Sequence, residues 1–314
     1  MKQRPADFDD VLLARALRED WAIAAHQLEY LPLGFGGHHW RATTAGASWF
    51  VTLNAIQEID YLRPALATAH WLEVSAGFES VVGPRPAHTG ELVRPLDERF
   101  ALSVYPWLGH VQPVYDADAA LTASLLKRLH AVALPRGLAR TEDFVLPRRA
   151  RLEAVLAETD MAWDGGPFGE SARNVARAYG HGIRKLLGLY DRLVERAPRD
   201  GWVITHGEPY GPNLLADDTG RLHLVDWDSA LCAPRERDLW DLPPTAAAHA
   251  AYGRACDAEV LRLYRAWYAL AELGLYLSLF RGPHPGDDND RQSWANIDLF
   301  LPTAERWPEL ALDS

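Results

Sequence analysis

Cysteine and lysine are both scarce in this sequence. Only two cysteines occur in 314 residues, Cys232 and Cys256, which is too few for a disulfide framework or for a set of metal ligands. A reducing compartment is therefore expected. Long hydrophobic runs are also lacking: no stretch approaches the roughly 20 apolar residues that span a bilayer, and residues 1–7 contain no apolar signal segment. The sequence thus predicts a cytoplasmic protein with no membrane partner.

Positive charge is in deficit as well. The chain has 32 Lys and Arg against 43 Asp and Glu, a formal net charge of −11, and its lysines are confined to positions 2, 127 and 185. Recognition of a phosphate backbone needs clustered cations, so nucleic acid is not expected as a partner. An acidic protein suits a cationic ligand better, although acidity for solubility alone is the simpler explanation. A hydrophobic fraction of 48% is ample for a core in one large domain or two.

The first hundred residues alternate between helix-like and strand-like patterns. Apolar residues at helical spacing predict helices, and short apolar runs bounded by turn residues predict strands. Together they indicate a small domain built on five strands. The expected helices cover 7–26 and 59–77, and the expected strands cover 28–33, 40–43, 48–53, 92–94 and 100–105.

The first hairpin of this domain is rich in glycine. Gly34, Gly36 and Gly37 precede the histidine pair His38 and His39. Glycine allows backbone N–H groups to approach a phosphate chain closely, so the hairpin is a candidate nucleotide-binding loop. A glycine hairpin that only turns the chain is the commoner explanation, and the motif that follows later in the sequence favours the nucleotide.

The strand pattern ends at a connector, beyond which the chain becomes mostly helical. We therefore expect a nucleotide-binding domain over 1–106 and a catalytic and substrate-binding domain over 107–314. In this arrangement Tyr105, Trp107 and Leu108 would form the apolar wall and backbone edge that meet the base of a nucleotide, although a simple turn explains the connector equally well. The expected helices of the second domain cover 119–132, 148–158, 172–197, 258–280 and 291–307.

Polar groups with informative spacing lie at the ends of two apolar runs. His206, Glu208 and Asn213 follow the first run, and Asp226 and Asp228 follow the second. This order has the form of a kinase catalytic loop and its metal-binding aspartate, with Glu where that loop normally has Asp. An acidic pair after a buried strand also occurs as a turn or helix cap, so the complete spacing carries the interpretation.

These residues resemble a known family. The run His-Gly-Glu-Pro-Tyr-Gly-Pro-Asn-Leu-Leu at 206–215, the Val-Asp-Trp-Asp at 225–228 and the Ala-Pro-Arg-Glu-Arg-Asp-Leu at 233–239 resemble the aminoglycoside phosphotransferase family, spectinomycin-type and related actinobacterial antibiotic and small-molecule kinases in particular. The resemblance is specific over 201–242. It implies an α+β, protein-kinase-like fold of two lobes, with a small five-stranded antiparallel sheet and a larger, mainly helical lobe.

The resemblance also implies an activity and roles for single residues. The family transfers the γ-phosphoryl group of ATP, sometimes GTP, to a hydroxyl of a small molecule, and such transfer depends mainly on positioning and charge neutralisation. Glu208 would accept or orient the substrate hydroxyl, and Asn213 and Asp226 would bind Mg²⁺ through oxygen. His206 would brace the loop by hydrogen bonds, and Asp238 would bond to the loop backbone.

Acidic residues elsewhere are candidates for substrate binding. Asp228 suits a second metal contact, a substrate contact or a helix cap equally well. Together with Glu236, Asp287, Asp288 and Asp290 it would match the ammonium or guanidinium groups of a cationic substrate. For the last three a solvated acidic loop is the alternative.

The sequence departs from the family in one important place. Its third strand has no lysine where the family pairs one with the α- and β-phosphates, and no lysine follows Lys2 in the small domain. His38, His39, Arg41 and Arg63 are candidates to replace it, or the metal ion alone supplies the positive charge.

We therefore expect an ATP- or GTP-dependent O-phosphotransferase that acts on an antibiotic or similar hydroxylated small molecule, as a resistance or self-resistance kinase. One alternative is a nucleotide-binding pseudokinase that acts as a sensor, which the missing lysine suggests. Another is a metabolic kinase with a choline-, homoserine- or sugar-type acceptor. Acceptor choice depends on side chains from several helices, so the sequence leaves it open.

Overall fold

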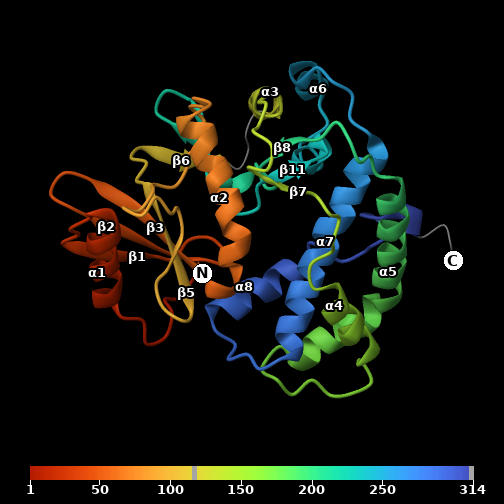
Figure 1. Ribbon diagram of the computed structural model, residues 1–314. Helices are drawn as coiled ribbons and strands as arrows, with labels where there is room; N and C mark the ends of the chain where they lie inside the picture. The colour runs from red at the N-terminus through yellow and green to blue at the C-terminus, as the bar shows by residue number, and fades with distance from the viewer. Residues whose placement is uncertain (115–118, 311–314) are drawn as a thin grey trace. The chain divides into compact units, whose positions relative to one another are not determined.

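The computed structural model describes residues 1–114 and 119–310 (Figure 1). The chain divides into two compact units, the first made of Met1–Glu142 with Asp200–Ala255 and the second of Asp143–Arg199 with Cys256–Ser314. The assignment of nucleotide binding to 1–106 and catalysis to 107–314 is a different, functional division, and it stays a prediction. Helices and a five-stranded antiparallel sheet confirm the expected α+β class.

The first unit begins with the five-stranded sheet. Its order is β1-β2-β3-β5-β4, and every neighbouring pair is antiparallel. The five strands and two helices expected from the sequence are all present, with ends that shift by a few residues. They are β1 (Gln27–Leu31), β2 (His38–Thr43), β3 (Ser48–Ala55), β4 (Arg94–Pro95), β5 (Phe100–Pro106), α1 (Asp10–Trp21) and α2 (Ile59–Val74).

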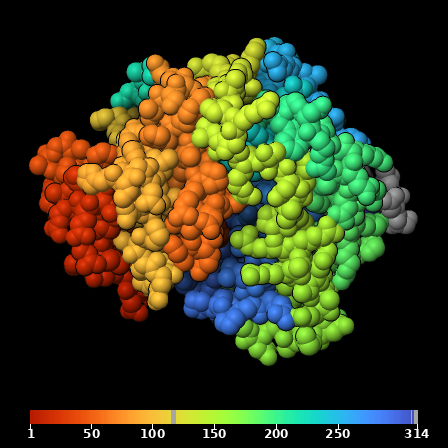
Figure 2. All heavy atoms as spheres, in the orientation of Figure 1, coloured from red at the N-terminus to blue at the C-terminus, as the bar shows by residue number. Residues whose placement is uncertain are grey.

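The two faces of this sheet have different surroundings because successive side chains of a strand point to opposite sides. On one face Val51 and Leu53 of β3 are fully buried in a cluster that includes Leu13 of α1. On the other face Leu62 of α2 packs in a cluster with Tyr105 of β5. The orange α2 and the gold segment that contains β4 and β5 lie side by side in Figure 2. This second face also carries polar side chains, and it leads to the candidate site.

The rest of the first unit contains two small sheets and short helices. One sheet has the order β10-β9-β6 and the other β7-β11-β8. Strands β6, β7, β9 and β11 were not expected from the sequence, because two to four residues are too few to show a periodic pattern. The elements are β6 (Val111–Pro113), α3 (Ala119–Leu129), β7 (Arg140–Thr141), β8 (Val203–Thr205), a 3₁₀ turn (Gly211–Asn213), β9 (Leu214–Asp217), β10 (Leu222–Leu224), β11 (Leu231–Ala233), a 3₁₀ turn (Arg235–Asp238) and α6 (Ala246–Tyr252).

The second unit is helical in its described part. Its long helices α5 and α7 pack against each other, and the buried aromatics Tyr264, Tyr276 and Phe280 of α7 belong to its core. None of the helices in the described residues is both long and apolar enough to span a membrane. The elements are α4 (Arg149–Ala157), α5 (Gly169–Arg196), α7 (Ala258–Arg281), α8 (Asp288–Ile297) and a 3₁₀ turn (Pro308–Leu310).

The last long helix differs from the expected 291–307. Helix α8 starts earlier because Asp287 is its N-cap: the Asp287 side chain accepts from the backbone N–H of Asp290, and the Asp290 side chain accepts from the backbone N–H of Asp287 in return. It ends at Ile297, five residues before Pro302, which cannot continue a helix and restricts the residue before it. The expected C-terminal half of the helix was therefore wrong.

Candidate active site

The polar residues of the expected catalytic motif do come together. They lie at the end of β8, in the turn before β9 and directly after β10, all within the first unit. Asn213 links the segments: its side-chain N–H₂ donates to the Glu208 carbonyl oxygen at 3.2 Å, and its own carbonyl oxygen accepts from the Val225 N–H at 3.0 Å. Glu208 and Asp226 are therefore held on either side of one asparagine.

The orientation of the Asn213 amide suits a metal ligand. Because its nitrogen donates to a carbonyl oxygen, the amide oxygen must be the other atom. That oxygen has no hydrogen-bond partner in residues 1–114 and 119–310. An amide oxygen left free beside carboxylates is a donor type that Mg²⁺ prefers.

Asp226 is held in an unusual backbone conformation. Its φ angle is +64°, in the left-handed region that few residues other than glycine adopt. Its carboxylate makes no hydrogen bond or ion pair with any described residue, and the residue is solvent-exposed. The surrounding protein nevertheless removes water and raises the pKa of Asp226. Strain combined with an unpaired carboxylate is typical of a functional group.

Asp228 is the second carboxylate of an acidic centre. The Asn54 side chain of β3 donates to Asp228 Oδ2 at 2.9 Å. Burial raises the pKa of Asp228, and so do the charges of Asp226, Glu58 and Glu208, while the bond from Asn54 opposes them only in part. Four carboxylates thus repel one another around this point. A bound divalent cation would relieve this repulsion.

The donor set fits a metal ion that is shared with a ligand. Among the described residues, no three His, Cys, Asp or Glu side chains form a complete metal-binding group. Mg²⁺ rarely has a cage made of protein alone: it binds one or two carboxylates together with phosphate oxygens and water. This requirement is met by Asp226 and the amide oxygen of Asn213, together with Asp228 of the same centre.

Gly207 and Asp238 hold the loop that carries Glu208. The N–H of Gly207 donates to Asp238 Oδ1 at 2.6 Å, and the N–H of His206 donates to Asp238 Oδ2 at 2.9 Å. Gly207 has a φ angle of +103°, and an added Cβ would lie 2.5 Å from Ser229 Oγ. No other residue fits this position without displacing its neighbours. The expected role of Asp238 as a support of the loop backbone is confirmed.

A buried network extends from Asp238 to α6. His130 Nε2 on α3 lies 3.1 Å from Asp238 Oδ2, and His130 Nδ1 lies 2.8 Å from the Tyr252 hydroxyl. Burial by itself raises the pKa of Asp238, but the hydrogen bond and charge of His130 and the charge of Arg237 outweigh it and lower the pKa. Asp238 is therefore ionised at neutral pH and accepts three hydrogen bonds.

His206 is a brace, because both of its ring nitrogens are occupied by backbone. Nε2 donates to the Val225 carbonyl oxygen at 2.8 Å, and Nδ1 accepts from the Glu208 N–H at 3.3 Å. Burial lowers the pKa of His206 to about 4, so the ring is neutral, and it stands edge-on to the buried Trp227. A neutral, fully bonded imidazole is not a proton acceptor for substrate, which agrees with the expected role.

Arg237 secures the far side of the same loop. Its guanidinium donates to Thr205 Oγ1 and to the Ser229 carbonyl oxygen, each at 2.9 Å. The Ser229 hydroxyl in turn donates to the His206 carbonyl oxygen at 2.8 Å. The loop backbone is therefore fixed from both sides before any ligand binds, as positioning chemistry requires.

The other acidic candidates are used within the protein. Glu236 is buried in the 3₁₀ turn, with Arg235 Nε 3.4 Å from its carboxylate. In the second unit, Asp287 and Asp290 cap α8 and Asp288 pairs with Arg291 at 2.5 Å. Their contribution to substrate binding stays a prediction.

The connector lies at the end of the polar sheet face. Tyr105 is buried, and both burial and the charge of Asp228 raise the pKa of its hydroxyl, so that ring faces the acidic centre. Trp107 and Leu108 keep part of their surface accessible. The Arg41 guanidinium stacks on the Trp107 ring, 4.6 Å from its centroid. Contact of these connector residues with a nucleotide base stays a prediction.

The glycine hairpin has the expected backbone freedom. Gly34 and Gly36 have φ angles of +64° and +90°. Gly34 and Gly37 pack on the ring of His39: an added Cβ would lie 3.1 Å from His39 Nε2 at the first and 3.2 Å from His39 Cε1 at the second. His38 lies on the opposite face of the sheet, where its ring meets Tyr30. Phosphate binding by the hairpin stays a prediction.

Sequence reasoning missed Asn54, Gly207, Ser229 and Arg237. Gly207 left a signal, because a glycine between two candidate site residues is typical of a position with a positive φ. The burial of Arg237 is visible only in the structure. Asn54 left no signal, because it meets Asp228 across 174 residues of sequence.

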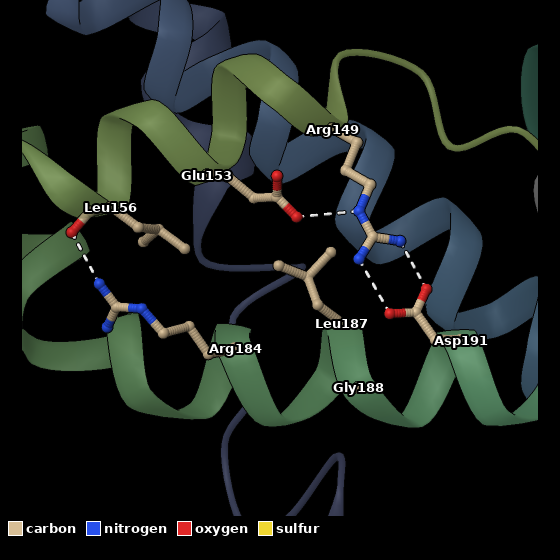
Figure 3. A pocket seen from close by; sticks show the side chains of 7 residues that line it. All are labelled: Arg149, Glu153, Leu156, Arg184, Leu187, Gly188 and Asp191. Carbon is tan, nitrogen blue, oxygen red and sulfur yellow. Dashed lines mark hydrogen bonds and ion pairs between the residues drawn. The ribbon is translucent and has the colours of Figure 1, made fainter.

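A groove also lies between α4 and α5 in the second unit (Figure 3). Its volume is about 360 Å³, and an ion pair between Arg149 and Asp191, 2.5 Å apart, closes one end. At the other end of the groove, the Arg184 guanidinium donates to the Leu156 carbonyl oxygen. The groove contains none of the predicted site residues, and its two arginines are matched by two carboxylates.

Known proteins resemble this chain along most of its length. Residues 27–274 match the phosphotransferase enzyme family, APH. Protein StrN of Streptomyces griseus is 29% identical over 293 residues, which cover 88% of this chain and 86% of that protein.

Solved structures share the fold. A spectinomycin phosphotransferase in complex with ADP and spectinomycin matches with a TM-score of 0.73 at 16% identity, over 91% of this chain and 93% of the other. A microcompartment-associated aminopropanol kinase matches with a TM-score of 0.65 at 16% identity, over 96% and 98%. The fold is therefore kinase-like, as expected, and because the family match covers most of the chain, this protein belongs to the phosphotransferase enzyme family and is a small-molecule kinase.

Proposed function

We propose that the protein transfers the γ-phosphoryl group of ATP to a hydroxyl of an antibiotic or a closely similar small molecule in the cytoplasm. The observation that carries the proposal is the acidic centre beside Glu208, in which Asp226 and the Asn213 amide oxygen have no hydrogen-bond partner among the described residues. Such a donor set suits a divalent cation that is shared with a nucleotide.

Each residue of the centre has a part in the transfer. Glu208 accepts the proton of the substrate hydroxyl as the new O–P bond forms and the bond between the β- and γ-phosphates breaks. Asn213, Asp226 and Asp228 would hold Mg²⁺, which when bound neutralises phosphate charge. His206 and Asp238 keep the loop backbone in place, and the reacting carboxylate with it.

The acceptor class is proposed from charge and from similarity. The similar solved structure with a TM-score of 0.73 is a phosphotransferase in complex with ADP and the antibiotic spectinomycin. Asp228 and the three carboxylates near it favour an acceptor that carries ammonium groups. An antibiotic with amines beside its reactive hydroxyl satisfies both requirements, and resistance or self-resistance would be its biological purpose.

The test is product formation on a defined panel. Purified protein is incubated with Mg²⁺ and ATP, or GTP, and with aminocyclitol antibiotics, choline, amino alcohols, homoserine and sugars, and ³¹P NMR detects a phosphate monoester. Glu208→Gln should lower kcat by about 10²–10⁴, the usual contribution of a general base. Glu98→Gln, at an exposed turn of the sheet, is the matched control and should change nothing. Wild-type protein without product on every acceptor, or an unaffected Glu208→Gln variant, contradicts the proposal.

A second candidate is a nucleotide-binding sensor without turnover. One observation favours it: the side chains of β3 on the site-facing side, Phe50, Thr52 and Asn54, include no cation. Thermal stabilisation by Mg²⁺ and nucleotide, without phosphate transfer to any acceptor, would distinguish the sensor from the enzyme.

A further inference from the structure

The polar face of the five-stranded sheet is laid out in rows. Strands β2, β3 and β5 are antiparallel neighbours, so residues in register stand side by side on one face. The three rows of this face are Arg41, Phe50 and Tyr105, then His39, Thr52 and Ser103, then Asn54 with Ala101.

The two ends of this face are identified by their neighbours. At one end Arg41 stacks on Trp107 of the connector. At the other end Asn54 donates to Asp228 of the acidic centre. Rows on one face are about 7 Å apart, so His39 and Thr52 lie in the middle, between connector and acidic centre. A nucleotide with its base at the connector and its terminal phosphate at the acidic centre would pass its phosphate chain over this middle row.

His39 is built into that row by three contacts. Its ring stacks on Phe50, with centroids 5.0 Å apart and planes inclined by 29°. Its Nδ1 lies 3.2 Å from Thr52 Oγ1. Gly34 and Gly37 of the glycine hairpin leave room for the ring, since a Cβ at either position would press on it. These contacts fix the position of the ring and leave Nε2 without a partner in the described residues.

The other candidates for the missing lysine are engaged elsewhere. His38 points to the opposite face, where its Nδ1 lies 3.2 Å from the Tyr30 hydroxyl. Arg41 donates to Ser48 Oγ and covers the connector. Arg63 on α2 pairs with Asp60 at 2.6 Å. His39 alone among the four stands in the middle row with a polar atom unused.

We infer that His39 takes the place of the missing lysine: its Nε2–H donates to the phosphate chain of the bound nucleotide, and the Thr52 hydroxyl sets the tautomer by donating to Nδ1. The inference rests on the proposed nucleotide-dependent function and deepens it. His39 is then a nucleotide-binding residue, and Thr52 is a positioning residue that acts through it.

The electrostatic surroundings agree with a neutral donor. Burial, the N-terminal amine and His38 lower the pKa of His39 to about 4. The amine donates to the carbonyl oxygens of Leu33 and Gly37 in the same hairpin. A neutral imidazole with Nδ1 as acceptor carries its proton on Nε2, and this N–H can bond a phosphate oxygen without taking up a proton.

The experiment compares ligands with and without phosphate. Isothermal titration calorimetry of the full chain with Mg²⁺ measures the Kd of ADP and of adenosine for wild type, His39→Ala and His39→Gln. His39→Ala should weaken ADP binding about ten- to hundredfold, the range for a hydrogen bond to a charged group, and change adenosine binding less than about twofold. His39→Gln keeps an N–H donor and should recover part of the loss. His88→Ala, at an exposed histidine in the turn before β4, is the control.

Thr52 has its own readouts. Thr52→Val keeps the shape of the side chain but removes the hydroxyl, so it should weaken ADP binding less than His39→Ala does. The ¹⁵N chemical shifts of His39 should show the Nε2–H tautomer in wild type and a mixture of tautomers in the variant. Thr52→Lys introduces a cation in the same row and should restore ADP affinity to His39→Ala.

Three results would overturn the inference. One is unchanged ADP affinity in both His39 variants, and another is an equal loss for ADP and adenosine, which would make His39 a support of the hairpin only. The third is a phosphate-specific loss in Arg41→Gln in place of the His39 variants. Wild-type protein that binds neither ligand would instead refute the proposed function, and this inference with it.

Discussion

Substitution of Gly207 by alanine should loosen the catalytic loop more than any other single methyl group added to it. The new Cβ would lie 2.5 Å from Ser229 Oγ and 2.6 and 2.7 Å from the two terminal nitrogens of Arg237. Arg237 is buried and cannot move without giving up its bonds to Thr205 and Ser229. Hydrogen bonds from a charged group contribute roughly 1.5–3 kcal/mol, so the collision should cost about that much.

A matched variant separates this collision from backbone strain. Gly220 also has a positive φ, +80°, but an added Cβ there would meet no atom within 4 Å. Gly220→Ala therefore reports the conformational cost alone, about 1–2 kcal/mol. The difference between the two variants isolates the displacement of Arg237.

Hydrogen exchange of the His206 and Gly207 amides is the suitable assay, because both donate to Asp238 and their protection reports opening of the loop itself. At about 1.4 kcal/mol for each factor of ten, Gly207→Ala should speed their exchange about ten- to hundredfold while Gly220→Ala leaves it unchanged. The turnover number should fall in parallel, since the loop carries Glu208. Equal protection of these amides in the two variants would refute the reasoning.

Three further predictions follow from other residues. Asp238→Asn places an N–H₂ group against N–H donors and should lower the free energy of unfolding by about 3–5 kcal/mol. Because the folded protein lowers the pKa of Asp238, the stabilisation by the Asp238 carboxylate is present above its unfolded pKa near 3.9. The difference from wild type in urea unfolding should therefore persist at pH 5 and shrink only as the pH falls through the lower folded pKa. The pKa values of His38, His39 and His206 are lowered to about 4 from an unfolded value near 6.5, so these three groups take up protons on unfolding between these limits. The raised pKa values of Asp226 and Asp228 act in the opposite direction, but they are two groups against three. The urea midpoint should therefore be lower at pH 5 than at pH 7.5, and an equal or higher midpoint at pH 5 would contradict this. Arg149→Gln breaks a surface ion pair with Asp191 and should change the free energy of unfolding by only about 0–1 kcal/mol, with a larger loss counting against solvent screening of the pair.

Local patterns allowed the candidate catalytic segment to be predicted from the sequence. Glu208, Asn213 and Asp226 lie within one short stretch, and their spacing survives as contact because Asn213 bonds to both flanking segments. The five strands and two helices of the first hundred residues were also predicted, since each is long enough or bounded clearly enough by turn residues.

Contacts between segments that are distant in the chain could not be predicted from the sequence. The bond from Asn54 to Asp228 and the pair of His130 with Asp238 join residues 174 and 108 positions apart. Register decides which side chains of β3 face the site, and a one-residue slip would exchange the two faces. The choice of His39 over His38 therefore needed the structure, as did the two-residue strand β7.

The three-stranded sheet β7-β11-β8 has a consequence for how this protein can diversify. Residues 143–199 leave the first unit directly after β7 and return directly before β8, and both strands pair with the same strand β11. The two ends of the segment are thus anchored on one sheet, so extra length in its exposed loops would cost little loop entropy. A replacement of the whole segment would have to keep the face of α5 that packs against α7. The residues that hold the loop with Glu208, Asp238 and Arg237 among them, lie outside this segment, so such changes would leave those supports in place.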